Sequence, residues 1–540
     1  MLQSRKIVKF DDEINSKLLK GINTLANAVK CTMGPRGKNV LIERPNQHPI
    51  ITKDGVTVAK SINLSDQFEN LGVQVIKEAS ARTADEAGDG TTTSMVLAQA
   101  LYTEGLKLLS AGHDAADIRA GIDTGVTRVL DELRSNAKEI SSDEELYQVA
   151  LISANGEHEI ADLISTAVRK VGRDGTVTVE EAKGFKSSLQ VVDGVKIERG
   201  FLSPYFISDS DKMHCELENC LILLSNKKFD SLKDLVRPLE FAIESGKPIL
   251  VVANEIDGDA MQGLVVNRVK GSLRVCAIKS PGFGQARHEM LEDLAVLTGG
   301  KVYGEGDDFT AFDYEHFGNC KKVTVKRTST LFVSNNQNSE VLKERINSIR
   351  TQLMTEDIDE DDRAVLTYRL NQLSGGIAVL RVGAASEAEM IERKDRVDDA
   401  LHATKAALEE GVLPGGGVAL VRASNVLSQL KKESSDYSSD YLTGINIVQN
   451  ACLEPVRQIV RNTGKSPDVV TQNILETYRD NHNYGYDARN EKFGDMIELG
   501  ILDPLKVVRC ALENAASVAS MLLSVGCGMI EDFSDKNKSL

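Results

Sequence analysis

The pattern of apolar and polar positions changes along the chain. Up to about residue 135, apolar residues recur at the spacing of one helix face, which predicts a mostly helical region. Two such stripes are Phe68, Leu71, Val75, Ile76 and Ala79, and then Leu97, Ala100, Leu101, Leu106 and Leu108.

The middle of the chain has a different pattern. Short β-rich runs begin near residue 174, and strands then alternate with helices. The predicted order is a strand at 249–252, a helix at 258–270, a strand at 273–278 and a helix at 289–297. This alternation predicts a mainly parallel sheet covered by helices.

Helical periodicity returns after this region. A long helical segment is predicted at 340–373, interrupted by the acidic stretch 356–362, which is typical of a solvated helix end or turn. A strand at 377–382 follows, and helix dominates from residue 385 onward. The uncharged run 514–530 is too short and too rich in Ser and Gly to span a membrane, and it predicts a buried helix.

Two helical ends around an α/β middle indicate one domain closed by both termini, with other structure inserted. Gly194 lies near one crossing and Gly375-Gly376 near the other. These glycines could serve as hinges or simply as turn residues.

Composition narrows the function classes. The 540 residues predict three or four domains, and 41% hydrophobic with 27% charged residues is typical of a soluble globular protein. The net charge of −16 disfavours a nucleic-acid or anionic-membrane surface. The eight cysteines form no CxxC pair, which favours buried reduced thiols. The first ten residues contain Arg5, Lys6 and Lys9 without an apolar segment, so we expect no signal or transit peptide and a cytoplasmic location.

The segment Gly88-Asp89-Gly90-Thr91-Thr92-Thr93 carries the strongest chemical signal, because it ends one helical pattern and opens another. The glycines permit close backbone approach, and the threonines and the helix N-terminus offer donors to a phosphate. Asp89 would repel a phosphate, but it could hold a Mg²⁺ that bridges phosphate oxygens. An ordinary glycine-rich turn with a Thr cap is the alternative.

Three more glycine-rich turns lie at 32–37, 53–55 and 415–417. None of them matches a Walker A loop or the dinucleotide fingerprint in its strand context. The carboxylates Asp54 and Asp399 are candidates to orient a water for attack on a γ-phosphate.

Taken together, these motifs resemble the group I chaperonins, the GroEL-like family, over almost the whole chain. The resemblance rests on residues 32–37, 53–60, 88–93, 199–206, 399–404 and 415–420. It implies a multidomain α and α/β fold. The mostly helical equatorial ATP-binding domain would comprise 1–136 and 411–540, a small α/β intermediate hinge domain 137–193 and 376–410, and the α/β apical substrate-binding domain 194–375.

The resemblance also implies ATP and Mg²⁺ as cofactors, with Asp89 as the metal ligand and Asp54 and Asp399 as catalytic residues. It places the nucleotide at Thr32, Met33, Gly34, Pro35, Lys53, Gly88, Asp89, Gly90, Thr91, Thr92, Thr93, Gly416, Asp487, Ala488 and Asp503. Asp487 stands where bacterial members commonly have Asn.

Apolar stripes in the part that the resemblance makes apical would ordinarily mean core packing. The resemblance instead implies an exposed surface that captures non-native polypeptides and a co-chaperonin lid. Its residues would be Phe201, Tyr205, Phe206, Val236, Leu239, Met261, Val265 and Val266.

The expected function is therefore that of an ATP-dependent chaperone. The resemblance implies self-association into heptameric rings. The short edge strands 5–10 and 40–43 would then be completed by strands of neighbouring subunits. A holdase or scaffold with weak ATP turnover is the alternative. A metabolic kinase or phosphatase would need an acceptor site that the sequence does not show. Three departures from the family are the absent Gly-Gly-Met tail, the polar insertion 433–441, and Lys465-Ser466-Pro467, which stands where many bacterial members have acidic residues at the contact between rings.

Overall fold

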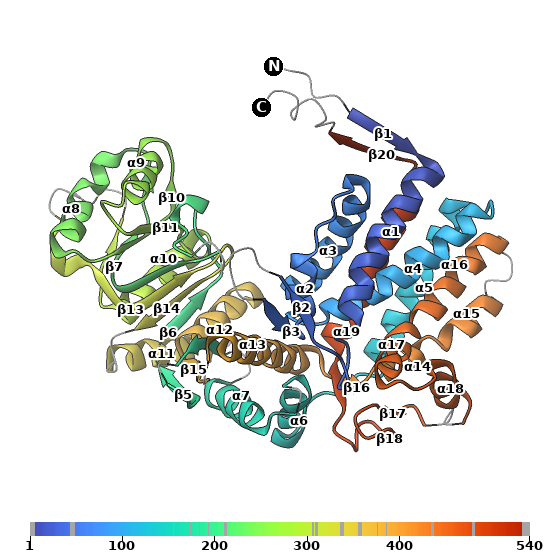
Figure 1. Cartoon of the computed structure of the whole chain (residues 1–540). Helices are drawn as coiled ribbons and strands as arrows, with labels where there is room; N and C mark the ends of the chain where they lie inside the picture. The colour runs from blue at the N-terminus through green and yellow to red at the C-terminus, as the bar shows by residue number, and fades with distance from the viewer. Residues whose placement is uncertain are drawn as a thin grey trace. The chain divides into compact units, whose positions relative to one another are not determined.

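The computed structural model describes residues 6–43, 49–154, 156–172, 175–182, 184–192, 194–209, 213–304, 307, 312–334, 340–354, 359–374, 376–384, 386–433, 437–477 and 481–531. The chain divides into two compact units. Unit 1 contains 1–165, 183–185 and 382–540, and unit 2 contains 166–182 and 186–381. The two segments expected to form an intermediate domain are thus shared between the units. Figure 1 shows the elements of each.

Unit 1 is mostly helical and is built from both ends of the chain. Its helices are α1 (Asp11–Lys30), α2 (Gly55–Ser61), α3 (Gln67–Ala87), α4 (Thr91–Ser110), α5 (Ala115–Ser135), α6 (Asp143–Ser153), α13 (Glu387–Glu410), α14 (Val418–Ala423), α15 (Val426–Glu433), α16 (Ser439–Ala451), α17 (Glu454–Thr463), α18 (Pro467–Gln472) and α19 (Leu505–Leu523). Helix α7 (His158–Val171) contains the division between the units.

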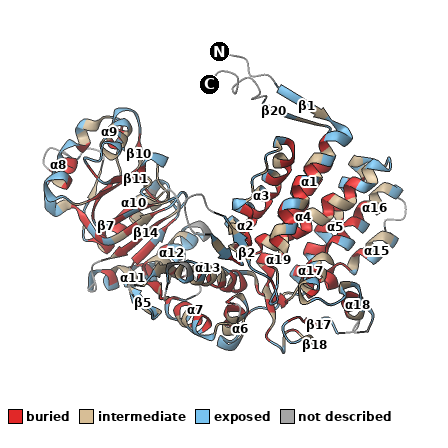
Figure 2. Ribbon diagram, viewed as in Figure 1, coloured by how far each residue is buried: buried red, intermediate tan, exposed pale blue. Residues whose placement is uncertain are grey.

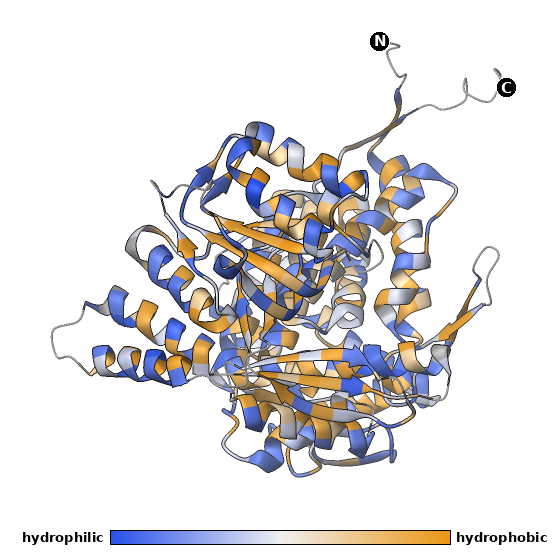
Figure 3. Cartoon of the chain, turned by 90° about the vertical axis from the view of Figure 1, so that its left-hand side faces the viewer, coloured by the Kyte–Doolittle hydropathy of each residue, from blue (hydrophilic) through white to orange (hydrophobic). Residues whose placement is uncertain are grey.

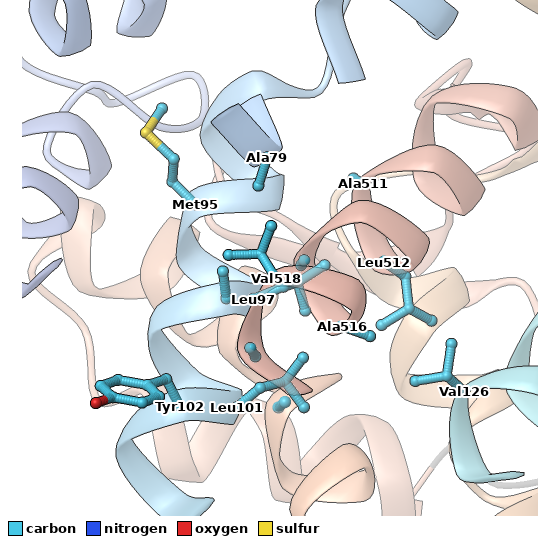
Figure 4. Close-up of a cluster of buried hydrophobic side chains, with 14 of the residues drawn as sticks. Ala79, Met95, Leu97, Leu101, Tyr102, Val126, Ala511, Leu512, Ala516 and Val518 are labelled. Atoms are coloured by element: carbon cyan, nitrogen blue, oxygen red, sulfur yellow. The ribbon is translucent and has the colours of Figure 1, made fainter. Parts of the chain in front are cut away.

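The core of unit 1 lies between α4, α19 and their neighbours. Apolar residues of α1, α3, α4, α5, α16 and α19 form one buried cluster. Figure 4 shows part of it, with Met95, Leu97, Leu101 and Tyr102 near Ala511, Leu512, Ala516 and Val518. Burial of these faces fixes α4, whose first residues belong to the strongest sequence motif.

Short two-stranded ribbons complete unit 1. They are β1 (Lys6–Phe10) with β20 (Cys527–Glu531), β2 (Val40–Ile42) with β3 (Ile50–Thr52), β16 (Val412–Pro414) with β19 (Leu502–Pro504), and β17 (Tyr484–Asp487) with β18 (Lys492–Asp495). The two predicted edge strands therefore each have a partner within the chain. The prediction of one helix over 514–530 is wrong in its second part, because α19 ends at Leu523 and β20 begins at Cys527.

Unit 2 is built around a seven-stranded sheet. Its strands are β6 (Gly194–Ile197), β7 (Cys215–Ser225), β9 (Ile249–Ala253), β11 (Val275–Lys279), β12 (Val302–Tyr303), β13 (Gly318–Val325) and β14 (Thr330–Ser334). The order is β11-β9-β7-β13-β14-β6, with β12 beside β7. Strands β11, β9, β7 and β12 pair in parallel, but β13, β14 and β6 pair antiparallel. The prediction of a mainly parallel sheet is wrong in this half, because β13 and β14 form a hairpin.

Helices and smaller strands surround this sheet. They are α8 (Val236–Ser245), α9 (Gly258–Val269), α10 (Gly284–Thr298), α11 (Glu340–Leu353) and α12 (Glu360–Ser374), with β8 (Lys228–Phe229) paired to β10 (Glu255–Ile256). A three-stranded sheet has the order β4 (Thr176–Glu181), β15 (Ile377–Val382) and β5 (Ser188–Val192). Figure 2 shows buried residues along the main sheet, and Figure 3 shows the apolar residues that its strands carry.

Gly194 has a packing role in unit 2. It begins β6 and pairs with Val333, and a Cβ there would lie 2.2 Å from Ile377 Cδ1 and 2.4 Å from Phe332 O. Close approach within unit 2 therefore accounts for a glycine at this position, and the hinge at Gly194 stays a prediction. The other expected hinge includes Gly375, which lies outside the described residues.

Within the described part of the chain, every helix falls short of the length or the apolar character that crossing a membrane would require.

Candidate functional site

Unit 1 contains a cavity of about 560 Å³. It lies where the turn after α1, the start of α4, the turn after β16 and the ends of β17 and β19 meet. Eleven of the residues expected at a nucleotide site line it: Thr32, Met33, Gly34, Pro35, Asp89, Gly90, Thr93, Gly416, Asp487, Ala488 and Asp503. Motifs far apart in the sequence are thus gathered at one place.

The start of α4 opens into this cavity. Gly88 ends α3 with φ 73°, and Gly90 precedes α4 with φ 83°, both in the left-handed region. Among the described residues no side chain caps α4, so the N–H groups of its first turn lack the usual protein acceptor. With the positive end of the helix dipole, these groups form a site that favours an anion.

Thr91 and Thr92 belong to the same turn but do not line the cavity. Thr91 is buried, and a Cβ on Gly55 would lie only 2.2 Å from Thr92 Oγ1. The expected alternative, a Thr side chain capping the helix, is not what the structure has, because the residue at the cap position is Gly90. Thr92 instead lies where α2 approaches α4 closely.

The turn at 32–37 is held by hydrogen bonds. Thr32 Oγ1 donates to Val29 O at 2.9 Å, and the Gly37 N–H donates to Gly34 O at 3.0 Å. Asn462 Nδ2 of α17 donates to Met33 O at 2.8 Å. Gly34 has φ 80°, which only glycine adopts readily. The wall that this turn gives to the cavity is therefore fixed in shape.

The turn after β16 brings a carboxylate to the cavity. Asp503 of β19 accepts hydrogen bonds from the backbone N–H groups of Gly416 and Gly417. Burial raises the pKa of Asp503 to about 6, and the negative charge of Asp89 adds to this rise. The carboxylates of Asp503 and Asp89 therefore lie close enough within the same site for their negative charges to repel each other.

Asp487 has a mainly local role in the structure. Its Oδ1 accepts from the N–H groups of Arg489 at 2.8 Å and Asn490 at 3.2 Å, and its Oδ2 accepts from Asn490 Nδ2 at 2.7 Å. The carboxylate thus closes the turn after β17. The neighbouring Ala488 is buried and presents an apolar surface to the cavity.

The remaining carboxylates are found beside the lining rather than in it. Asp54 caps α2, since its Oδ1 accepts from Val56 N at 3.0 Å and its Oδ2 from Thr57 N at 2.7 Å. Asp399 lies on α13, and burial raises its pKa well above the usual range, with further rises from the charges of Asp89, Asp54 and Asp395. Burial, together with the charge of Asp54, also raises the pKa of Asp89. Lys53 is exposed and does not line the cavity.

Sequence reasoning missed two parts of this site. Asp395 lies one helical turn before Asp399, and burial followed by the charge of Asp54 raises its pKa to about 6. The spacing of the two aspartates was the available signal. The other part is a wall formed by Leu151, Ile152, Ser153, Gly156 and His158, whose residue types carry no chemical signature.

In the part of the chain that the structure describes, no three His, Cys, Asp or Glu side chains are grouped so that they could hold a metal ion. A metal ion in the cavity would therefore be held by the protein through one carboxylate, that of Asp89. Mg²⁺ is commonly held by one or two carboxylates together with substrate phosphates and water, so this donor set fits the ion.

Comparison with known proteins decides the family. The model of the TCP-1/cpn60 chaperonin family matches residues 25–531. The chain belongs to this family. Two solved structures of the chaperonin gp146 from the bacteriophage EL 2 (Pseudomonas aeruginosa), both in the presence of ATP-BeFx, have the same fold. Crystal form II has a TM-score of 0.73 at 24% identity, and crystal form I has 0.64 at 23%. Each match covers 97% of this chain and 99% of that one.

The apolar residues expected to capture polypeptides lie in unit 2 of this chaperonin, and they differ in exposure. Tyr205, Val236 and Val266 are exposed at 68%, 42% and 46%. Phe201, Met261 and Val265 are partly buried against the core. The prediction of an exposed capture residue is wrong for Phe206 and Leu239, because at 0% and 6% exposure they belong to that core. The apolar surface of α8 and α9 also includes Ile243 and Val269, exposed at 52% and 66%, which sequence reasoning missed.

Proposed function

We propose that this chaperonin is an ATP-dependent molecular chaperone that acts in the cytoplasm. It captures non-native polypeptides on unit 2 and promotes their folding in a ring cavity, driven by ATP binding and hydrolysis in unit 1. The observation that carries this proposal is the uncapped start of α4, which opens beside Asp89 into a cavity of about 560 Å³. Pockets of this volume accommodate small ligands and cofactors.

The nucleotide phosphates would bind at the start of α4. The first-turn N–H groups and the Thr93 hydroxyl are the donors, and Asp89 would hold a Mg²⁺ on the phosphate oxygens. The ion would neutralise charge on the phosphates and so assist their transfer to water. Its binding would also relieve the repulsion among these carboxylates, which contributes to the raised pKa of Asp89 and of Asp399.

Asp54 and Asp399 are proposed to orient the attacking water. Phosphoryl transfer depends mainly on positioning and charge stabilisation, so a carboxylate that accepts a hydrogen bond from water is sufficient. Asp54 already accepts two backbone hydrogen bonds, which fix its direction. Its oxygens keep lone pairs for a further donor.

Self-association into a ring is supported by the small ribbons of unit 1. The β2–β3 ribbon exposes Leu41 and Ile51 at 68% and 63%, and each of its strands is paired on one side only among the described residues. A neighbouring subunit could cover these side chains and extend the ribbon. We propose a heptameric ring, which native mass spectrometry would test. Only monomers and dimers under all nucleotide conditions would contradict it.

The decisive experiment compares two variants of the purified protein. Asp399→Ala should bind ADP and ATP with nearly unchanged affinity but hydrolyse ATP at least about a hundredfold more slowly, because a transition-state contact is lost. Asp89→Ala should lose Mg²⁺-dependent nucleotide binding as well as hydrolysis. Hydrolysis at the normal rate in both variants would contradict the assignment.

Capture of a non-native chain is tested separately. Val266→Ser replaces an exposed apolar side chain on α9 and should weaken binding of an unfolded client by about 1 kcal/mol, with ATP hydrolysis unchanged. Val341→Ser is the matched control, because Val341 is 60% exposed on α11. Equal client affinity in Val266→Ser, Val341→Ser and the unmodified protein would remove α9 from the capture surface.

A holdase or scaffold with weak turnover is the second candidate. It would bind the client without stimulation of ATP hydrolysis by that client. We favour the ATP-driven function because the charges of Asp89 and Asp54 both act on Asp399, as expected of carboxylates that share one hydrolytic site.

A further inference from the structure

Unit 1 has a second cavity, also of about 560 Å³, between four helices. It is lined by residues of α1, α4, α16 and α17, which lie in the same helical part of Figure 1. The nucleotide cavity described above has a different set of lining residues. Nothing in the proposed ATPase cycle uses this second cavity.

Three of the five charged residues in its lining are basic. Arg457 Nη1 and Arg461 Nη1 of α17 lie 3.1 and 3.0 Å from the two carboxylate oxygens of Glu454. The single carboxylate of Glu454 is thus paired with two guanidinium groups. Lys30, at the end of α1, donates to the neutral Gln99 Oε1 at 3.2 Å. Burial and the nearby charge of Arg461 lower the pKa of Lys30, so a negative charge in this cavity would be favourable.

Two further acids lie near these cations without removing the excess. Glu104 lines the cavity, but its Oε1 lies 2.6 Å from Lys107 Nζ. Asp468 Oδ1 lies 3.4 Å from Arg457 Nε, and its side chain is 81% exposed. Exposed ion pairs of this kind are strongly screened by water. In a chain with a net charge of −16, a cavity lined by three basic and two acidic residues departs from the overall acidic balance.

Uncharged donors and an apolar wall complete the lining. The buried oxygen of Thr103 has no hydrogen-bond partner within the described part of the chain. Val96, Ala100 and Ala451 add apolar surface. A single inorganic ion would fill only part of about 560 Å³, so the cavity has room for an organic group beside an anionic one.

We propose that this cavity binds the phosphoryl group of a small organic phosphate through Lys30, Arg457 and Arg461. Guanidinium groups match phosphate oxygens in pairs, and an ammonium adds a point charge.

The cavity shares a helix with the nucleotide site. Pro455 and Ile459 of α17 line the nucleotide cavity, and Arg457 and Arg461 line the second one. In addition, Asn462 Nδ2 donates both to Lys30 O at 3.0 Å and to Met33 O at 2.8 Å. An organic phosphate that draws Arg461 and Lys30 together therefore acts on the turn that bounds the nucleotide. Its binding changes the affinity for ADP, and ADP changes its affinity by the same factor.

Calorimetric titration of the full chain tests the proposal. The protein is first saturated with Mg²⁺ and a non-hydrolysable ATP analogue, so that the γ-phosphate position is filled and the probes cannot enter the nucleotide site. Inorganic phosphate, pyrophosphate and glucose 6-phosphate are then compared as probes. Binding of glucose 6-phosphate more tightly than inorganic phosphate is expected, because it uses the apolar wall as well. Equal affinities would show that the site takes the inorganic ion alone, and absence of binding by all three would overturn the proposal.

Three variants locate the site. Arg461→Gln and Lys30→Gln, on different helices, should each weaken glucose 6-phosphate about tenfold, the effect of one lost charge-assisted hydrogen bond. Glu454→Gln should act in the opposite direction and tighten binding several-fold, because it frees both arginines. Arg119→Gln on α5 removes the same charge at an exposed position outside the cavity and should have no effect.

The directions of these changes separate a ligand site from a structural cluster. Circular dichroism first establishes that each variant is folded, and misfolding of one leaves the other two informative. Unchanged glucose 6-phosphate affinity in Arg461→Gln and Lys30→Gln, or weaker binding in Glu454→Gln, would overturn the assignment. The ADP affinity, measured with and without glucose 6-phosphate, should differ in the unmodified protein and not in Arg461→Gln. Equal ADP affinities in the unmodified protein would refute the coupling.

Discussion

Replacement of Gly90 by alanine is the sharpest test of how the start of α4 works. Gly90 has φ 83°, a conformation that costs an L-residue about 1–2 kcal/mol. The added Cβ would also lie 2.8 Å from Val507 Cγ1, on the packed helix α19. Relief of that contact costs about 1–3 kcal/mol more. Gly90→Ala should therefore lower the free energy of unfolding by about 2–5 kcal/mol.

The same change should weaken nucleotide binding. The strain is relieved by a rotation of the peptide that carries the first-turn N–H groups, and these groups are the proposed phosphate donors. Loss of one such hydrogen bond to a charged oxygen corresponds to about a tenfold rise in the Kd for ADP. Urea denaturation followed by circular dichroism gives the stability, and ADP titration gives the affinity.

Gly112→Ala is the matched control. Gly112 follows the other end of α4 with φ 92°, and a Cβ there meets no heavy atom within 4 Å. It should show the backbone cost alone, about 1–2 kcal/mol, with unchanged ADP affinity. If Gly90→Ala is destabilised as expected but binds ADP normally, the start of α4 does not hold the phosphates. If both variants lose affinity equally, the effect is one of global stability.

Two further predictions concern buried charge. Arg369, 3% exposed, donates two hydrogen bonds of 2.6 and 3.0 Å to the carboxylate of Asp293. Arg369→Met should therefore lower the free energy of unfolding, measured by urea denaturation, by about 3–5 kcal/mol. The control Arg350→Met, at an exposed position, should change it little. Asp395 has its pKa raised to about 6 by burial and by the charge of Asp54, so the folded state loses stability as the pH rises from about 4 to 6. Asp395→Asn should therefore stabilise the nucleotide-free protein by about 1–2 kcal/mol at pH 7.5 and not at pH 4, measured as the shift in Tm. A Tm gain that is equal at both pH values would refute the role of ionisation.

Much of the fold was predictable because its elements carry local signals. Helix α9 and strand β9 agree with their predicted ranges within a residue or so, since helical periodicity and a buried β-branched run are properties of the segment itself. The pairing of β13 with β14 was not predicted. Their direction depends on a tight connection between them and on the partner β7, and neither follows from the spacing of apolar residues.

The candidate site was predictable to the extent that glycine and carboxylate chemistry marks it. Gly34, Gly90 and Gly416 have positive φ at the cavity, and each stood in a conspicuous turn. The wall at 151–158 was missed because its residues are ordinary for a helix end. Leu239 illustrates the remaining limit, since apolar spacing identifies a helix face without saying whether another element covers it.

Helix α4 links the two cavities of unit 1. The residues at its start, Asp89, Gly90 and Thr93, line the cavity proposed to bind the nucleotide, and Gln99 and Thr103, two and three turns further on, line the second cavity. Between them, the other face of α4 is buried against α19, with Met95, Leu97 and Leu101 at 0% exposure. A close-packed interior leaves little free volume in which a displacement can be absorbed. We therefore expect a shift at Gly90 to move α4 as a body, so that the affinity for the proposed organic phosphate depends on whether ADP is bound.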